Sequence, residues 1–372
     1  MASSKTDNSL DIPSVLSVQE LIKEPIISVP QQYVHLDQQK PTFSACTDPL
    51  PTLPTVDLNL LVSLDTTNLE LEKLHSTCKE WGFFQSKRLF IQLVNHGVSS
   101  SLMDKLKHEI EEFYNLPLEE KMKYVVRPDD FQGYGKARLE QKLDWGDRFY
   151  MITNPIQHRK PHLFPELPPS LRDTLEFYLQ ELQRLAMKLL GFIAEALKMD
   201  SKEIEEMFDD GMQSVRMTYY PPCPQPELVI GLRPHSDATG ITILNQLNGI
   251  DGLQVKKDGV WIPVKFIPDA LVVNVGDILE ILSNGVYNSV EHRATINSEK
   301  ERISIAFFVN PKFEAEIGPS TSLISPQNPP SFRRIRMEKY VKDFFSRELD
   351  SKSFLELLKI ESTEGAAVLD GN

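Results

Sequence analysis

Apolar residues recur at helical spacing through most of the first half of the chain. From 69 to 81 and from 101 to 114 they return every three or four positions, which predicts two amphipathic helices. The longest pattern of this kind predicts a third helix over 170–198. A short helix is expected over 18–23 and a β segment over 54–58, so the first half is predicted to be mainly helical.

The pattern changes near Ser214, where short runs of alternating apolar and polar residues begin and continue to Asn310. Asp258-Gly259 separates two such runs and predicts a hairpin. Short strands without interleaved helices favour a β-sandwich or a jelly roll. The expected strands are VRMTYY, GITILNQL, GLQVKK, VWIPVK, ALVVNVGD, YNSVEHRATI and RISIAFFVN.

These patterns predict an α+β protein with a mainly β core and surrounding helices. A further helical stretch is expected around 337–358. The expected parts are an N-terminal extension (1–53), an N-terminal domain (54–165), a long helical connector (166–212), a jelly-roll domain (213–313) and a C-terminal helical tail (314–372).

The charge and cysteine content of the chain argue against several classes of binding partner. Asp and Glu number 53 against 40 Lys and Arg, for a net charge of -13, so nucleic acid is a poor partner. The three cysteines are too few for a disulfide framework and fit a reducing compartment. No secretory signal or membrane-spanning apolar stretch is recognised, and no coiled coil. We therefore expect a cytoplasmic monomer that acts on a small molecule and does not bind membranes.

One set of residues has the composition of a metal site. His235 and Asp237 are two positions apart in a segment expected to be extended, so both side chains should point to one face. His292 is the best candidate for a third ligand. Two histidines and one carboxylate leave other positions on a metal open, as in non-haem Fe(II) oxygenases. A structural zinc site is disfavoured, because the set contains no thiolate.

A second pair of residues follows on the next expected strand. Arg302 and Ser304 are again two positions apart, so they should share a face. A guanidinium group binds a carboxylate through two parallel hydrogen bonds, and a neighbouring hydroxyl adds a third donor. Either pair alone would be weak support for a site, but their order within one β region makes coincidence improbable.

The motifs together resemble the plant 2-oxoglutarate- and Fe(II)-dependent dioxygenases, especially the senescence-related subgroup that includes alkaloid O-demethylases. The resemblance covers about residues 15–360. It is carried by HSD with His and RIS downstream, and by PTVDL, CKEWGFF, LVNHGV, FYNLPLEEK, KLDW, RKPHLFPELP, MTYYPPCPQPEL, NVGDILEILSNG and YNSVEHRA.

The resemblance implies a double-stranded β-helix, that is, a jelly roll, and a role for each matching residue. His235, Asp237 and His292 match the iron ligands. Arg302, Ser304 and Tyr220 match the residues that bind 2-oxoglutarate. Tyr134, Phe149 and Phe308 are further candidates, for the substrate pocket.

The activity implied is hydroxylation or O-demethylation of a small specialised metabolite: an alkaloid, a phenylpropanoid or a hormone. O2 and 2-oxoglutarate would be consumed, succinate and CO2 released, and ascorbate would support turnover. Two alternatives are a catalytically impaired metabolite-binding member of the same fold and a zinc-dependent hydrolase. The hydrolase is disfavoured because it gives Arg302 and Ser304 no task.

Three features depart from the family pattern. Residues 86–92 interrupt a run that would otherwise read WGFFQLVNHGV, as a mispredicted splice junction would. We expect this insertion to be looped out, with Leu89, Phe90 and Ile91 at risk of exposure. The segment GYGKARLEQKLDW is shorter than usual, and Thr218 stands where relatives have Asn.

Overall fold

The computed structural model describes residues 17–36, 53–63, 67–80, 90–128, 130–135, 142–347 and 352–360. The α-helices are α1 (Val18–Leu21), α2 (Leu58–Val62), α3 (Thr67–Glu80), α4 (Ser100–Asn115), α5 (Leu118–Lys121), α6 (Pro169–Leu197), α7 (Ser201–Phe208), α8 (Asp277–Leu282), α9 (Met337–Phe345) and α10 (Ser353–Glu356). None of the described helices is long and apolar enough to span a bilayer.

The strands form a large sheet, a smaller one and a two-stranded ribbon. The large sheet has the order β1 (Thr55–Asp57), β2 (Phe90–Val94), β10 (Leu271–Val275), β7 (Ile241–Gln246), β12 (Arg302–Val309), β5 (Gln213–Tyr220), β4 (Asp147–Asn154) and β3 (Gly133–Tyr134). The smaller sheet has the order β6 (Leu232–His235), β11 (His292–Ala294), β8 (Leu253–Lys257) and β9 (Val260–Pro263). The ribbon pairs β13 (Glu316–Ile317) with β14 (Ile335–Arg336).

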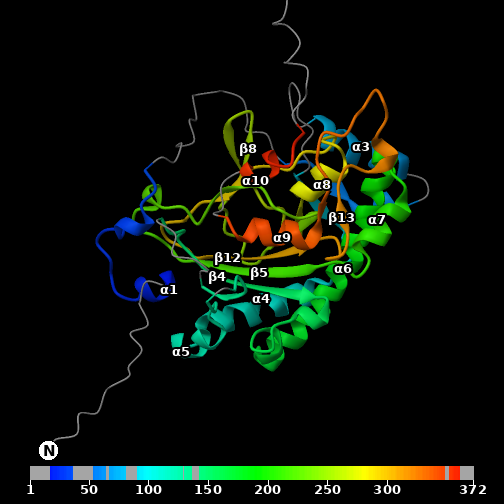
Figure 1. Cartoon of the computed structure of the whole chain (residues 1–372). Coiled ribbons are helices and arrows are strands. Elements are labelled where there is room, and N and C mark those ends of the chain that lie inside the picture. The colour runs from blue at the N-terminus through cyan, green and yellow to red at the C-terminus, as the bar shows by residue number, and fades with distance from the viewer. Residues whose placement is uncertain are drawn as a thin grey trace, which may run out of the picture.

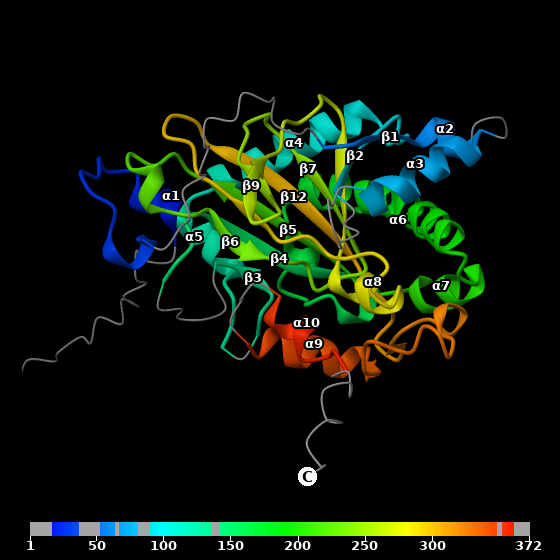
Figure 2. The same ribbon diagram turned by 90° about the horizontal axis from the view of Figure 1, so that it is seen from above.

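The two main sheets and their helices make the expected jelly roll. Figure 1 shows α4 and α6 beneath the large sheet, whose strands β4, β5 and β12 are labelled, and β8 of the smaller sheet above it. The view from above in Figure 2 places α9 along one side of the strands, away from α4. The α6 helix buries one apolar face, including Leu175, Leu182 and Leu189, against the large sheet and α4. The α+β jelly-roll prediction is therefore confirmed.

The large sheet joins segments from both halves of the sequence. Strands β1 to β4 come from the first half, and two of them, β2 and β4, pair with β10 and β5 of the second half. One hydrophobic core contains side chains of α4, α6, β5 and β12. The division of the chain into parts at 53, 165, 212 and 313 stays a prediction.

Two expectations about elements were wrong. The β region contains a short helix, α8, although no interleaved helix was expected there. The insertion at 86–92 is not wholly looped out, because Phe90, Ile91 and Gln92 form the first positions of β2, inside the large sheet. Phe90 and Ile91 are buried rather than exposed, since each packs on one side of this sheet. Leu89 lies outside the described residues.

Candidate metal centre and the cavities beside it

His235, Asp237 and His292 meet in a buried cluster. His235 ends β6 and pairs directly with His292, the first residue of the neighbouring strand β11. The Nε2 atoms of His235 and His292 lie 3.6 and 3.7 Å from Oδ1 of Asp237. One potential ligand atom from each residue falls within 4.8 Å of the others, a spacing that suits one metal ion. The strand ends before Asp237, so irregular chain and not a continuous strand brings this carboxylate to the histidines.

The hydrogen bonds of the two imidazoles leave the atoms nearest Asp237 available. Nδ1 of His235 lies 2.8 Å from the carbonyl oxygen of Arg233, and Nδ1 of His292 lies 3.0 Å from that of Val290. A carbonyl can only accept, so Nδ1 is the protonated nitrogen of each ring, and in the neutral form Nε2 keeps a lone pair. Nε2 of His235 is buried without a hydrogen-bond partner in the described structure. A metal ion fits this arrangement, because it would take up the unshared lone pairs.

Asp237 is oriented from its other side. Thr242 Oγ1 and Asn274 Nδ2 donate to its Oδ2 at 2.7 and 2.8 Å, so Oδ1 is the atom that faces the histidines. Burial by itself would raise the pKa of Asp237, but His292, His235 and these donors together lower it. Burial also lowers the pKa of His235. A divalent metal requires an ionised carboxylate and neutral imidazole ligands, and these shifts favour that state for Asp237 and His235.

Sequence reasoning missed the residues that support the cluster. Asn274 is not among the predicted site residues, yet its side chain donates directly to Asp237. Asp277, also absent from that set, begins α8 and accepts a hydrogen bond at 3.1 Å from Ser236, the residue between His235 and Asp237. Gly276 is needed there because a Cβ would stand 2.2 Å from the carbonyl oxygen of Thr239. The signal in the sequence was the run NVGD itself, which ends a buried strand with polar residues.

Arg302, Ser304 and Tyr220 lie together at a small cavity beside the metal cluster. Arg302 pairs with Tyr220, and Ser304 with Thr218, between β12 and β5. All four line the cavity, together with His292 and Asp237. Arg302 is buried, its guanidinium carbon lies 4.9 Å from the Tyr220 ring centre, and its Nε has no described hydrogen-bond partner. This donor suits a small anion bound next to the metal cluster.

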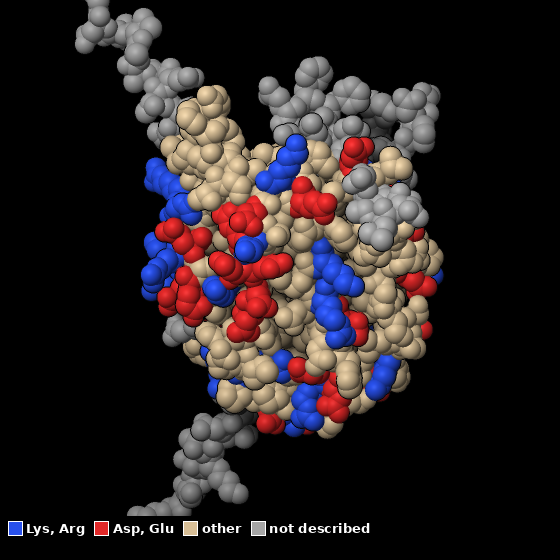
Figure 3. Space-filling view, turned by 90° about the vertical axis from the view of Figure 1, so that its right-hand side faces the viewer, with Lys and Arg blue, Asp and Glu red and all other residues tan. Residues whose placement is uncertain are grey.

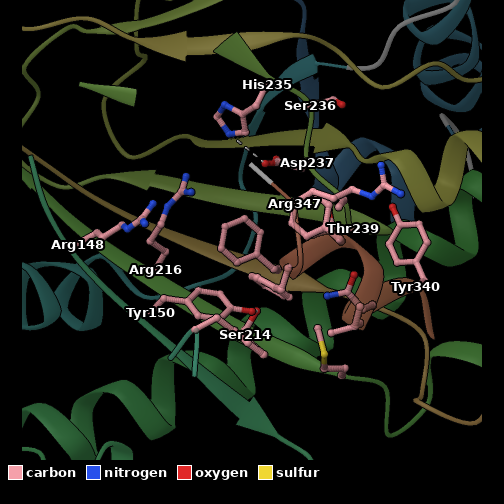
Figure 4. Close-up of a pocket in the computed structure, with 18 of the residues that line it drawn as sticks. Arg148, Tyr150, Ser214, Arg216, His235, Ser236, Asp237, Thr239, Tyr340 and Arg347 are labelled. Atoms are coloured by element: carbon pink, nitrogen blue, oxygen red, sulfur yellow. Dashed lines mark hydrogen bonds and ion pairs between the residues drawn. The ribbon is translucent and has the colours of Figure 1, made fainter. Parts of the chain in front are cut away.

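A second, larger cavity of about 190 Å³ also borders His235 and Asp237. Figure 4 shows side chains from β4, β5 and the C-terminal segment around it. Of the three residues predicted for the substrate pocket, Phe308 lines this cavity, and Tyr134 and Phe149 do not. On β4 alternate residues face opposite sides, so Arg148 and Tyr150 face the cavity while Phe149 stacks on Phe113 in the core. Tyr134 points to Asp147 instead, where its hydroxyl donates over 2.8 Å.

Comparisons with known proteins agree with this geometry. The profile of the 2OG-Fe(II) oxygenase superfamily matches residues 211–311, and that of the non-haem dioxygenase in morphine synthesis N-terminal domain matches 53–170. Oxoglutarate-dependent flavonoid 7-O-demethylase 1 of Ocimum basilicum is 50% identical, covering 97% of this chain and 95% of its own. Codeine O-demethylase of Papaver somniferum is 48% identical, covering 96% and 98%.

A solved structure supports the same assignment. The crystal structure of JOX2 in complex with 2OG, Fe and JA superposes with a TM-score of 0.80 at 35% identity, covering 93% of this chain and 98% of that one. Both halves of the chain, the jelly roll and the buried His-Asp-His cluster thus point to one family. The chain is an enzyme of the 2OG-Fe(II) oxygenase superfamily, with iron and 2-oxoglutarate as its cofactors.

Proposed function

We propose that His235, Asp237 and His292 hold Fe(II), and that Arg302, Ser304 and Tyr220 bind the distal carboxylate of 2-oxoglutarate. The observation that carries this proposal is the pair of unpartnered buried atoms, Nε2 of His235 and Nε of Arg302. Unsatisfied buried polar atoms are costly, so their presence in two adjacent places favours ligands there. Both residues border the small cavity or its metal cluster.

The residues of this chain would hold the reactants and exclude water. Bound iron and 2-oxoglutarate supply an oxidation in which O2 is consumed, succinate and CO2 are released, and a C–H bond of the substrate is hydroxylated. Thr242 and Asn274 fix the carboxylate of Asp237, and the carbonyls of Arg233 and Val290 fix the imidazoles. The aromatic wall formed by Phe308, Phe344 and Phe345 lies beside the cluster and limits access of solvent to it.

We propose a small specialised metabolite as the substrate: an alkaloid, a phenylpropanoid or a hormone, hydroxylated or O-demethylated in the larger cavity. The names of the relatives support this class, since one is a flavonoid 7-O-demethylase and another a codeine O-demethylase. The apolar walls of the cavity support a mainly apolar molecule. When the oxidised carbon belongs to an O-methyl group, the hydroxylated product loses formaldehyde.

The test is turnover with methoxylated compounds. Purified protein with Fe(II), 2-oxoglutarate and ascorbate would be given 7-methoxyflavones, codeine and methoxycinnamic acids, and succinate and formaldehyde would be measured. We expect at least one compound to raise succinate formation well above the level without substrate, with formaldehyde released in equal amount for demethylation. Succinate without formaldehyde would favour hydroxylation. No stimulation by any compound would contradict the proposed substrate class.

We also propose that the enzyme works as a monomer in the cytoplasm, without a nucleic-acid or membrane partner. The net charge of -13 supports this exclusion of nucleic acid. Figure 3 supports it further, because on that face acidic side chains gather among basic ones and, for the part of the chain described, leave no extended basic surface. Cys223 is buried as a free thiol, which suits a reducing compartment.

A further inference from the structure

Three arginines surround the larger cavity. Arg148 lies on β4 and Arg216 on the adjacent strand β5, and Arg347 follows α9. Figure 4 shows Arg148 and Arg216 next to each other on one side, with Arg347 on another side nearer Tyr340. Arg148 pairs in register with Thr218, two residues from Arg216, so these two side chains share a face of the sheet.

The described structure offers these guanidinium groups no carboxylate in ion-pair distance. Arg148 donates from Nε to the carbonyl oxygen of Gly135 at 3.3 Å. Arg216 lies 5.4 Å over the ring of Phe308, and Arg347 lies 5.6 Å over that of Phe354. Arg233 differs from these three arginines, because its Nε lies 3.2 Å from the carboxylate of Asp144.

The cavity therefore has an excess of positive charge. Among the described residues that line it, Asp237 is the only acid. Its negative charge would be neutralised by the bound metal. Burial lowers the pKa of Arg148, Asp144 opposes that change, and the charge of Arg216 adds to it. Neighbouring like charges repel each other in a partly desolvated site, and a bound anion would relieve the repulsion.

The co-substrate would not supply that anion. A dication, the Asp237 carboxylate, dianionic 2-oxoglutarate and the Arg302 guanidinium have formal charges that cancel. Arg148 and Arg347 border the larger cavity and not the small one that contains Arg302, whereas Arg216 borders both. The positive charges of Arg148 and Arg347, at least, are therefore not balanced by 2-oxoglutarate and can interact with the substrate that is oxidised.

We propose that the substrate carries a carboxylate, which binds between Arg148 and Arg216 while its aromatic or apolar body lies against Phe131 and Phe345. This rests on the proposed function of the site. Guanidinium groups match a planar carboxylate with paired hydrogen bonds. Phe131 and Phe345 stack with ring centres 3.9 Å apart and offer a flat apolar surface in the same cavity. A substrate with a protonated amine is disfavoured by the same charges.

The test compares an acid with its uncharged ester in the complete enzyme. The probes are 4-methoxycinnamate and methyl 4-methoxycinnamate, whose binding to protein with Fe(II) and 2-oxoglutarate is measured by anaerobic equilibrium dialysis. We expect the acid to bind roughly ten- to a hundredfold more tightly than the ester, as for a charge-assisted contact. In Arg148→Gln this preference should vanish, and Arg148→Lys should restore part of it.

Two controls distinguish loss of the carboxylate contact from a folding defect and from failure of the metal assignment. Arg184→Gln, on the exposed side of α6, should keep the preference of the original enzyme. The 2-oxoglutarate concentration needed to form the visible iron complex should be unchanged in Arg148→Gln. Equal or weaker binding of the acid, or a preference that survives Arg148→Gln, would overturn the proposal. Absence of the visible complex would instead contradict the metal assignment, while dialysis would still decide the question of charge.

Discussion

At the scale of single residues, hydrogen bonds on the far side of each ligand determine which atoms can bind the metal. Backbone carbonyls fix the imidazoles of His235 and His292, and two side chains fix Asp237. The ligand types and their spacing could be predicted from the sequence. Thr242 and Asn274 could not, because β7 and β10 bring them to Asp237 only through sheet pairing.

A single substitution can remove one of the hydrogen bonds that orient Asp237. Thr242→Val keeps the shape of the side chain and deletes the hydroxyl that donates to Asp237. We expect Fe(II) to bind roughly 10- to 100-fold more weakly, because residues that orient metal ligands contribute about this much to affinity. Anaerobic titration with Fe(II) measures the change.

Thr153→Val is the matched control. Thr153 is equally buried, but its hydroxyl has no hydrogen-bond partner in the described structure, so the change should leave metal affinity as it was. Unchanged affinity in Thr242→Val, or an equal loss in both variants, would show that the hydrogen bond to Asp237 is unimportant.

At the scale of elements, long periodic segments could be predicted and short ones could not. The helices α3, α4 and α6 and the strands β5, β7, β8, β9, β10 and β12 lie where periodicity placed them. The segment around His235 was expected to be extended, but strand β6 is absent from the expected strands because LRPH alternates poorly and contains a proline. Helix α8 was missed because DILEIL is buried on all sides and lacks an exposed polar face.

Strand β2 explains how the chain accommodates its insertion. The strand begins Phe90-Ile91-Gln92, and the sequence just before the insertion reads Phe83-Phe84-Gln85. The two triplets are nearly equivalent, so deletion of Ser86–Gln92 would supply a second copy of the same strand positions. The ring of Phe90 lies 5.7 Å from that of His292, and Gln92 accepts from the backbone of Ile267.

We therefore predict that the variant lacking Ser86–Gln92 folds with β2 intact. Its melting temperature should fall within a few degrees of the original, and it should bind Fe(II) with similar affinity. A deletion of Ser86–Ile91 is the control, because it places Gln85 at the fully buried position of Ile91 and should unfold the sheet locally. Equal behaviour of the two deletions, in thermal melts monitored by circular dichroism, would contradict this account of the strand.

At the scale of the whole molecule, a buried carboxylate is one of the groups that attach the segment 17–36 to the β region. Asp147 on β4 accepts from the Ser17 hydroxyl at 2.5 Å, from the Val18 backbone at 2.6 Å and from the Tyr134 hydroxyl at 2.8 Å. Tyr33 packs edge-on against Trp145 in the same region. The sequence predicted the helix of this segment but not its partner, because the contact spans 130 positions of sequence.

Ser17→Ala tests this attachment. The substitution removes one donor to Asp147 and the side-chain cap of α1, which should cost about 1–3 kcal/mol. We expect faster proteolysis within 17–36 and a lower melting temperature, whereas Ser101→Ala, at an exposed site, should change neither. Identical proteolysis of Ser17→Ala and the original chain would contradict the proposed attachment.

The measurement that most directly tests the central claim is anaerobic addition of Fe(II) and then 2-oxoglutarate, followed by visible absorption of the chelated complex. We predict a charge-transfer band in the original protein, no band in His235→Ala, and in Arg302→Ala a band that needs at least roughly tenfold more 2-oxoglutarate. A folded original protein that forms no band would contradict the assignment of these residues and favour a metabolite-binding member without catalysis. A band of full strength in His235→Ala would contradict it equally.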